Sequence, residues 1–269
     1  MQLNVFRTLW GVTTPWQQTV SELRSVGCCG IEARVPLTPE EQRTLAQRIE
    51  ASALEYIAIV FSGGGVIPAQ AETPAQHLER LKERFAAAKA LNPRFVNLLA
   101  GNDRWPLAQQ VDFLGKAHEL AAEYELFCSF ETHRATSLYS PWLTLEIIQQ
   151  LPQLRFTADI SHWIVVSERL LDDPCDDFSA FIERVHHIQA RAGYDQGPQV
   201  PAPRRAGISG GPAVSAALLG TDLAIAAPAR LPAHHAYAGI WPRWLPASPA
   251  VYQRSGRRPV VAERLDGPA

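Results

Sequence analysis

Apolar runs alternate with amphipathic segments along most of the chain. Leu54–Phe61 is apolar almost throughout, which is typical of a strand in a sheet covered on both faces. Thr73–Leu91 carries apolar residues at intervals near 3.6, which predicts an amphipathic helix. Because the two patterns repeat in alternation, we predict parallel strands joined by helices.

Before residue 192 the same patterns predict strands at Gln2–Phe6, Gly30–Val35, Leu54–Phe61, Arg94–Leu99, Leu126–His133, Arg155–His162 and His186–Arg191. The predicted helices are Pro15–Val26, Thr38–Ala53, Thr73–Leu91, Pro106–Tyr124, Pro141–Leu151 and Ser179–Val185. Repeated units of this length predict an α/β fold, a (β/α)8 TIM barrel that is incomplete at its C-terminal βα unit.

The composition changes near Arg204. Beyond it lysine is absent, the acidic residues are Asp222, Glu263 and Asp266, and alanine, proline, glycine and arginine dominate. We therefore divide the chain into a barrel domain, residues 1–203, and a tail, residues 204–269. The tail is interpreted either as disordered or as an out-of-frame reading of the end of a barrel.

Length and charge narrow the class of protein. The 269 residues suit one barrel of about 250. A net charge of −2 favours neither nucleic acid nor an anionic membrane as a partner. With no signal segment and no apolar run near the ~18 residues of a membrane helix, we expect a soluble, cytoplasmic protein. The sequence does not decide whether the protein forms an oligomer. The four cysteines lack zinc-type spacing, which favours free thiols.

Polar groups follow three successive predicted strands. Glu131, Asp159 and Gln189 each come at the end of such a strand, and parallel strands place these ends at one face. Carboxylate and amide oxygens are ligands that Mg²⁺ or Mn²⁺ prefers. An imidazole from His187 would shift the preference toward Mn²⁺, Co²⁺ or Zn²⁺. The sequence therefore predicts a divalent-metal site.

Strand parity selects further candidates. His186 and His187 are adjacent and point to opposite faces, so we predict His187, Gln189 and Arg191 as the inward set. Glu131 can serve as an acid/base group, His162 can hold a substrate oxygen, and Arg191 can neutralise an anionic group. Glu32 and His133 are additional candidates for substrate contact, with surface pairing as the alternative.

Three motifs resemble those of the xylose-isomerase-like barrel superfamily: Phe130-Glu131-Thr132-His133, Asp159-x-x-His162, and His187-Ile188-Gln189 followed by Arg191. The resemblance covers about residues 1–203. Within the superfamily, the His-Ile-Gln motif is similar to that of the hydroxypyruvate isomerase-like branch, in which the glutamine is a metal ligand. It implies Glu131, Asp159 and Gln189 as ligands, with His162 and Arg191 touching the substrate.

The resemblance also implies a function. It points to a divalent-metal-dependent isomerase or epimerase that moves a proton through an enediolate, on a sugar, sugar phosphate or small hydroxy-keto acid. The alternatives are a catalytically impaired or non-catalytic sugar-binding barrel and an endonuclease IV-like metal-dependent nuclease. The nuclease is disfavoured because it needs more histidines and a basic groove for DNA.

Such enzymes also use a glutamate on the eighth strand, as fourth ligand and second acid/base group, in a Pro-Glu-Phe-Gly-like stretch that this chain lacks. One codon choice for Tyr237–Pro242 is TAC GCC GGA ATT TGG CCA. Read one base later, it encodes Thr-Pro-Glu-Phe-Gly. Our hypothesis is that the tail is out of frame from near Arg204.

Overall fold

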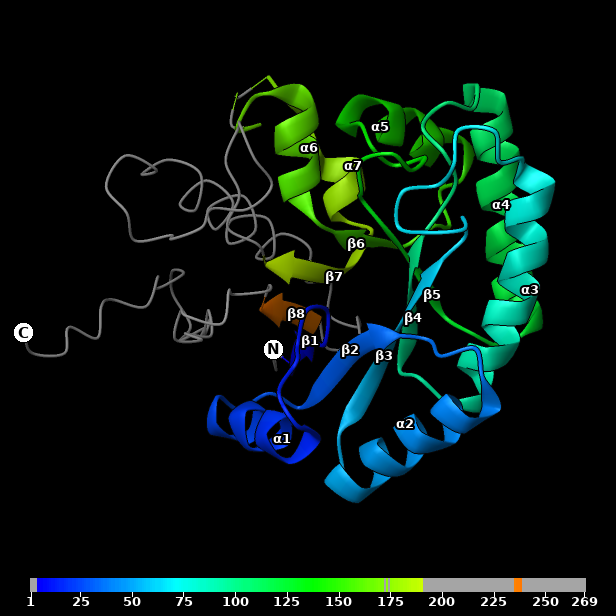
Figure 1. Ribbon diagram of the computed structural model, residues 1–269. Helices are drawn as coiled ribbons and strands as arrows, with labels where there is room; N and C mark the ends of the chain where they lie inside the picture. The colour runs from blue at the N-terminus through cyan, green and yellow to red at the C-terminus, as the bar shows by residue number, and fades with distance from the viewer. Residues whose placement is uncertain (1–3, 172, 174, 191–234, 239–269) are drawn as a thin grey trace, which may run out of the picture.

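The computed structural model describes residues 4–171, 173, 175–190 and 235–238. Its parallel strands form a closed barrel in which each strand pairs with the next along the chain and the last pairs with the first (Figure 1). The strands are β1 (Asn4–Thr8), β2 (Gly30–Arg34), β3 (Glu55–Phe61), β4 (Phe95–Leu99), β5 (Cys128–Glu131), β6 (Phe156–Ala158), β7 (Val185–Ala190) and β8 (His235–Ala238).

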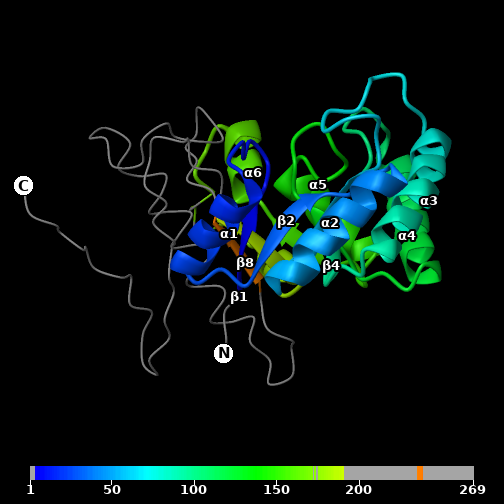
Figure 2. The ribbon, with the colours of Figure 1, turned by 60° about the horizontal axis from the view of Figure 1, so that its bottom comes forward.

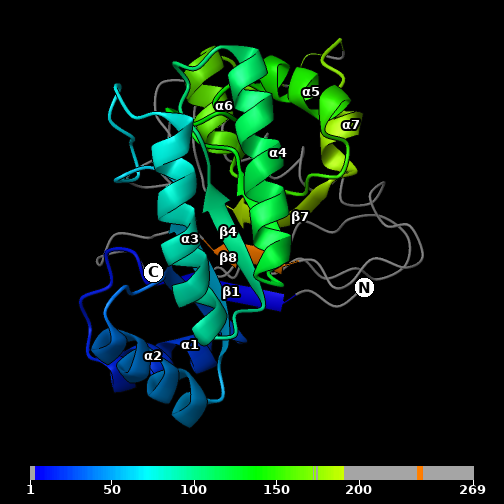
Figure 3. The same cartoon turned by 90° about the vertical axis from the view of Figure 1, so that its right-hand side faces the viewer.

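Helices surround the barrel in chain order. They are α1 (Trp16–Ser25), α2 (Pro39–Ser52), α3 (Pro74–Ala90), α4 (Leu107–Glu123), α5 (Pro141–Gln150), α6 (Ile160–Ser167) and α7 (Ser179–Ile182). Figure 2 shows α1 and α2 beside the first strands, and Figure 3 shows α3 and α4 side by side over β4. None of the described helices is long and apolar enough to cross a membrane.

The predicted α/β barrel is confirmed. Strands β1 to β7 lie where the seven predicted strands do, within a few residues at their ends. β8 lies in the segment treated above as a tail, and its four residues pair with β1 and β7. The residues between β7 and β8, and those after β8, lie outside the described part of the chain.

One predicted strand is shorter than expected. Arg155–His162 was predicted as a single strand, but β6 ends at Ala158 and α6 begins at Ile160. Asp159 is the residue before the helix, and His162 lies in its first turn. The β-branched run that continues through Val166 favours a strand locally, and the packing of α6 on the barrel overrides that preference.

Two apolar layers hold the barrel together. Phe6, Ile57 and Phe95 form a separate buried cluster inside the barrel. A larger core lies between the strands and the helices and includes Phe85 and Phe113. Full burial of one such large side chain stabilises the fold by about 1.5–3 kcal/mol.

The loops after β3 and β4 are joined by a buried polar network. Ser62, directly after β3, lies 2.8 Å from His77 Nδ1 on α3, and its Oγ accepts a hydrogen bond from the Gly101 N–H at 2.8 Å. His77 Nε2 lies 2.9 Å from Glu72, which also accepts from the Gly64 N–H. This network fixes the carboxyl-end loops against α3.

Candidate metal centre and active site

Four polar side chains from different strands meet inside the barrel. The side-chain N–H₂ of Asn97, on β4, donates to Oε1 of Glu32 on β2 and to Oε2 of Glu131 on β5, each at 2.7 Å. Gln189, on β7, donates to the same two oxygens at 3.4 and 3.2 Å. All four residues are at most 8% exposed. Glu131 and Gln189 therefore converge, as two of the three predicted ligands should.

Glu32 is not a surface residue. Its side chain is 0% exposed, and it lies in the same network as Glu131. The alternative of surface pairing is wrong for this residue. Arg34, two residues later on the same strand, is exposed, and its guanidinium lies 4.8 Å from the centre of the Phe61 ring.

Asp159, the third predicted ligand, is fully buried at the end of β6. Its backbone N–H donates to Thr132 Oγ1 at 2.8 Å, and its Oδ1 accepts from the Ser161 hydroxyl at 2.5 Å. Its Oδ2 lies 3.5 Å from Nε2 of His162. In this arrangement the carboxylate is directed toward His162.

The two predicted histidines at the strand ends lie against each other. The ring centres of His133 and His162 are 3.8 Å apart, and both side chains are buried. One ligand atom from each, together with a Glu131 carboxylate oxygen, forms a group whose members all lie within 4.8 Å of one another. An imidazole-rich group of this kind suits Zn²⁺, Co²⁺ or Mn²⁺.

Glu131 therefore belongs to two possible donor sets. One combines it with Gln189 and the other with His133 and His162. Both contain the nitrogen or oxygen donors that a divalent cation requires, and both are buried at the carboxyl ends of the strands, where barrel enzymes carry their sites.

Two of the three residues predicted to face inward from β7 are buried. His187 is 0% exposed and Gln189 is 8% exposed. The centre of the His187 ring lies 5.3 Å from that of Phe95, which belongs to the inner apolar cluster. His187 precedes Gln189 by two residues on β7. His186 contacts Phe95 and the half-exposed Phe127. Arg191 lies outside the described residues.

Two residues at the site were not predicted from the sequence. Asn97 is the single polar residue in the otherwise apolar strand Phe95–Leu99, which is the signal that could have revealed it. Arg134 follows His133 directly, and its guanidinium lies 3.0 Å from His162 Nδ1. Its position after a motif of ligand-type residues was the available hint.

His77, outside this site, is neutral near pH 7. Burial lowers its pKa to about 4, against the opposing effect of Glu72. Its neighbours are the rings of Trp105 and Phe113. Because Ser62 and His77 are both 0% exposed, their contact supports the loops rather than forming an accessible nucleophile.

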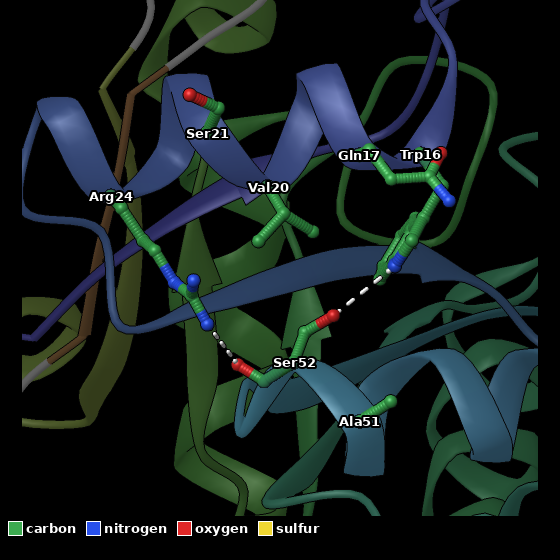
Figure 4. Close-up of a pocket in the computed structure, with 7 residues that line it drawn as sticks. All are labelled: Trp16, Gln17, Val20, Ser21, Arg24, Ala51 and Ser52. Atoms are coloured by element: carbon green, nitrogen blue, oxygen red, sulfur yellow. Dashed lines mark hydrogen bonds between the residues drawn. The ribbon is translucent and has the colours of Figure 1, made fainter.

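A groove of about 330 Å³ lies elsewhere, between α1 and α2 (Figure 4). Trp16 Nε1 donates to Ser52 Oγ at 3.1 Å, and Arg24 donates to the Ser52 carbonyl at 3.3 Å. These bonds join the two helices. None of the described residues that line the groove carries a carboxylate or an imidazole, so they offer none of the chemistry of the metal centre.

A family model described as "Xylose isomerase-like TIM barrel" matches residues 20–206, more than half of the chain. No curated protein matches the chain.

Solved structures resemble the barrel at low sequence identity. An L-ribulose 3-epimerase has a TM-score of 0.59 at 15% identity, with 90% of this chain and 82% of that one covered. The 3-keto-D-glucoside 4-epimerase YcjR from E. coli, in its apo form, has a TM-score of 0.57 at 12% identity, with 91% and 95% covered. The IolI protein with a bound zinc atom has a TM-score of 0.51 at 12% identity, with 69% and 72% covered. These likenesses concern the fold.

Proposed function

Because the chain belongs to the family of xylose isomerase-like TIM barrels, we propose that it is a divalent-metal-dependent isomerase or epimerase. Its substrate is a sugar, a sugar phosphate or a small hydroxy-keto acid, and the reaction proceeds by proton transfer through an enediolate. The sugar epimerases among its structural neighbours support this substrate class.

The observation that carries the proposal is the position of Glu131. Its carboxylate is 4% exposed at the carboxyl end of β5, 3.2 Å from Gln189 and within 4.8 Å of ligand atoms of two histidines. A carboxylate in these surroundings can both bind a cation and exchange a proton with a substrate carbon.

We propose Glu131, Asp159 and Gln189 as the metal ligands. The bound ion would polarise a substrate carbonyl and stabilise the negative charge of the enediolate. Mg²⁺ and Mn²⁺ fit the oxygen donors, and the nearby imidazoles allow Zn²⁺ or Co²⁺. The zinc atom bound in the IolI protein, a barrel of similar fold, supports a divalent metal as the cofactor.

The other residues act on the substrate. Glu131 removes a proton from the carbon beside the carbonyl. His162 is proposed to hold a substrate oxygen, and His133 lies against its ring. Glu32 and His187 are proposed contacts from inside the barrel, and Arg191 is proposed to neutralise an anionic group.

The test is exchange of substrate C–H for deuterium in D₂O, followed by NMR over a panel of ketoses, ketose phosphates and hydroxy-keto acids with Mn²⁺ or Mg²⁺. We expect exchange with at least one compound, and its loss in E131Q. The matched control is E146Q, an exposed glutamate on α5.

Absence of metal-dependent exchange over the panel, by this chain and by a version with the reading frame restored, would overturn the isomerase proposal. Saturation-transfer binding of a sugar without exchange would identify a non-catalytic sugar-binding barrel instead.

We also propose that residues 204–269 are read out of frame. In the shifted reading, the glutamate spans the codons of Gly239 and Ile240, directly after β8 ends at Ala238. The end of a strand is where a ligand of the barrel belongs, which supports the hypothesis. A gene with no single-base slip near codon 204, together with an intact mass that matches the present sequence, would refute it.

A further inference from the structure

We propose that Glu32 and Asn97 are part of the metal site, and that they add a carboxylate and an amide oxygen to the proposed ligands Glu131, Asp159 and Gln189. The added ligands would come from β2 and β4. This inference rests on the proposed function, because it assumes that an ion binds at Glu131. It goes beyond that function by adding a carboxylate from β2.

The first argument is convergence. Glu32 and Glu131 are 99 positions apart in the chain, yet an oxygen of each lies 2.7 Å from the same Asn97 nitrogen. The two oxygens are therefore no further apart than twice that distance. Gln189 Nε2 approaches the same pair of oxygens at 3.4 and 3.2 Å. Four side chains from four strands thus point to one place.

The second argument is charge. Two carboxylates carry two formal negative charges, whereas the amides that bridge them carry only partial charges. Holding like charges this close inside a barrel is costly, and a divalent cation between them offsets both charges.

The third argument is an oxygen with no hydrogen bond. Asn97 is 0% exposed, and its Oδ1 has no hydrogen-bond partner among the described residues, although its amide is aimed between the two carboxylates. Buried carbonyl oxygens usually have a partner, so this one calls for an explanation. A half-turn of the terminal amide exchanges Nδ2 for Oδ1 and directs the oxygen to the point between the carboxylates.

The resulting donor set consists of oxygen atoms alone. The carboxylates of Glu32, Glu131 and Asp159 and two amide carbonyls, completed by water or substrate oxygens, match the ligands of Mg²⁺, Mn²⁺ or Ca²⁺. The same half-turn at Gln189 gives the ligand that the sequence motif predicted. On this basis Glu32 supplies a further carboxylate without a contribution from β8.

The test is Mn²⁺ binding by the full chain, measured as loss of the free-ion EPR signal and by calorimetry. We expect E32Q and E131Q each to bind Mn²⁺ at least about tenfold more weakly than the parent, since each loses a ligand charge. E146Q, the exposed control, should bind as the parent does. N97D, which adds a carboxylate, should bind more tightly, and N97L more weakly.

The outcomes separate the two proposals. If E131Q binds weakly while E32Q and N97L bind as the parent does, the present inference is wrong and the metal at Glu131 stands. If E131Q also binds as the parent does, or the parent does not bind Mn²⁺, both proposals fail.

Thermal melting distinguishes the loss of a metal ligand at Glu32 from a general loss of stability. In EDTA, E32Q should melt above the parent, because the substitution removes one of two neighbouring like charges. With Mn²⁺ the order should reverse, because the parent gains more from the ion. If E32Q melts lower in EDTA and responds to Mn²⁺ as the parent does, Glu32 is only structural and the inference is overturned.

Discussion

Arg134 donates a hydrogen bond to Nδ1 of His162, at 3.0 Å. A guanidinium has only N–H donors, so Nδ1 must be the acceptor and the imidazole proton must lie on Nε2. Nε2 is the atom that lies 3.5 Å from Asp159. Arg134 is therefore a positioning residue, which makes His162 a hydrogen-bond donor at the nitrogen that faces Asp159.

Replacing Arg134 should change the tautomer of His162. In R134M we expect the Nε2–H form to give way to a mixture, because the donor to Nδ1 is gone. Long-range ¹⁵N–¹H NMR spectra of the histidine-labelled protein would show this, with H162Q used to assign the signal. R104M, at an exposed arginine, is the control. An unchanged His162 spectrum in R134M would show that the contact does not set the tautomer.

His77 should make the protein less stable in mild acid. Its pKa is about 4 in the folded state, lowered by burial, and near 6.5 in the unfolded chain. Only the unfolded state takes up a proton between these values, so stability is complete above about pH 6.5 and is lost as the pH falls toward 4. The loss between about pH 7.5 and about pH 5 should be about 2 kcal/mol.

Urea unfolding at these two pH values would measure the effect. H77L should be less stable than the parent at the higher pH, because it loses the contacts to Ser62 and Glu72, but it should lose about 2 kcal/mol less on acidification. H118L, at a half-buried histidine with no such network, is the comparison. An equal loss in H77L and in the parent would mean that His77 does not resist protonation.

Two glycines should respond to alanine in opposite ways. Gly101 has φ of +80°, and a Cβ there would overlap the Ser137 side chain. G101A should cost at least about 2 kcal/mol, since it combines backbone strain with a clash. Gly115 lies in α4, where a Cβ would meet Leu151 at an ordinary 3.6 Å. G115A should stabilise the protein by roughly 0.5–1 kcal/mol. Chemical denaturation measures the change in the free energy of unfolding for each variant, and changes of the same sign in G101A and G115A would contradict the interpretation.

Two threonine caps differ in completeness. Thr73 forms a reciprocal capping box with Gln76 at the start of α3, whereas Thr38 accepts from the Glu41 N–H but has no reciprocal bond to its own backbone. We expect T73A to cost about 1 kcal/mol and T38A about half as much. Equal losses in urea unfolding would show that the returning Gln76 bond adds nothing.

Site residues could be predicted from the sequence where a single local pattern of apolar and polar residues identifies them. An apolar strand that ends on a polar group identifies Glu131, and the period of two along β7 separates His187 and Gln189 from His186. Both features are local, so they can be interpreted without knowing what lies opposite.

Features that depend on distant partners were missed. Asn97 acquires its role only because β2 and β5 bring Glu32 and Glu131 to either side of it. The end of β6 at Ala158 depends likewise on how α6 packs, since the residues that follow prefer a strand locally. Arg134 matters because of a helix that begins 26 residues later, at Ile160.

The cluster of Phe6, Ile57 and Phe95 fills the inside of the barrel below the polar residues. We infer that it blocks passage along the barrel axis, so in the proposed isomerase substrate and product would use the same opening. Product would then leave before the next substrate enters, and it should compete directly with substrate.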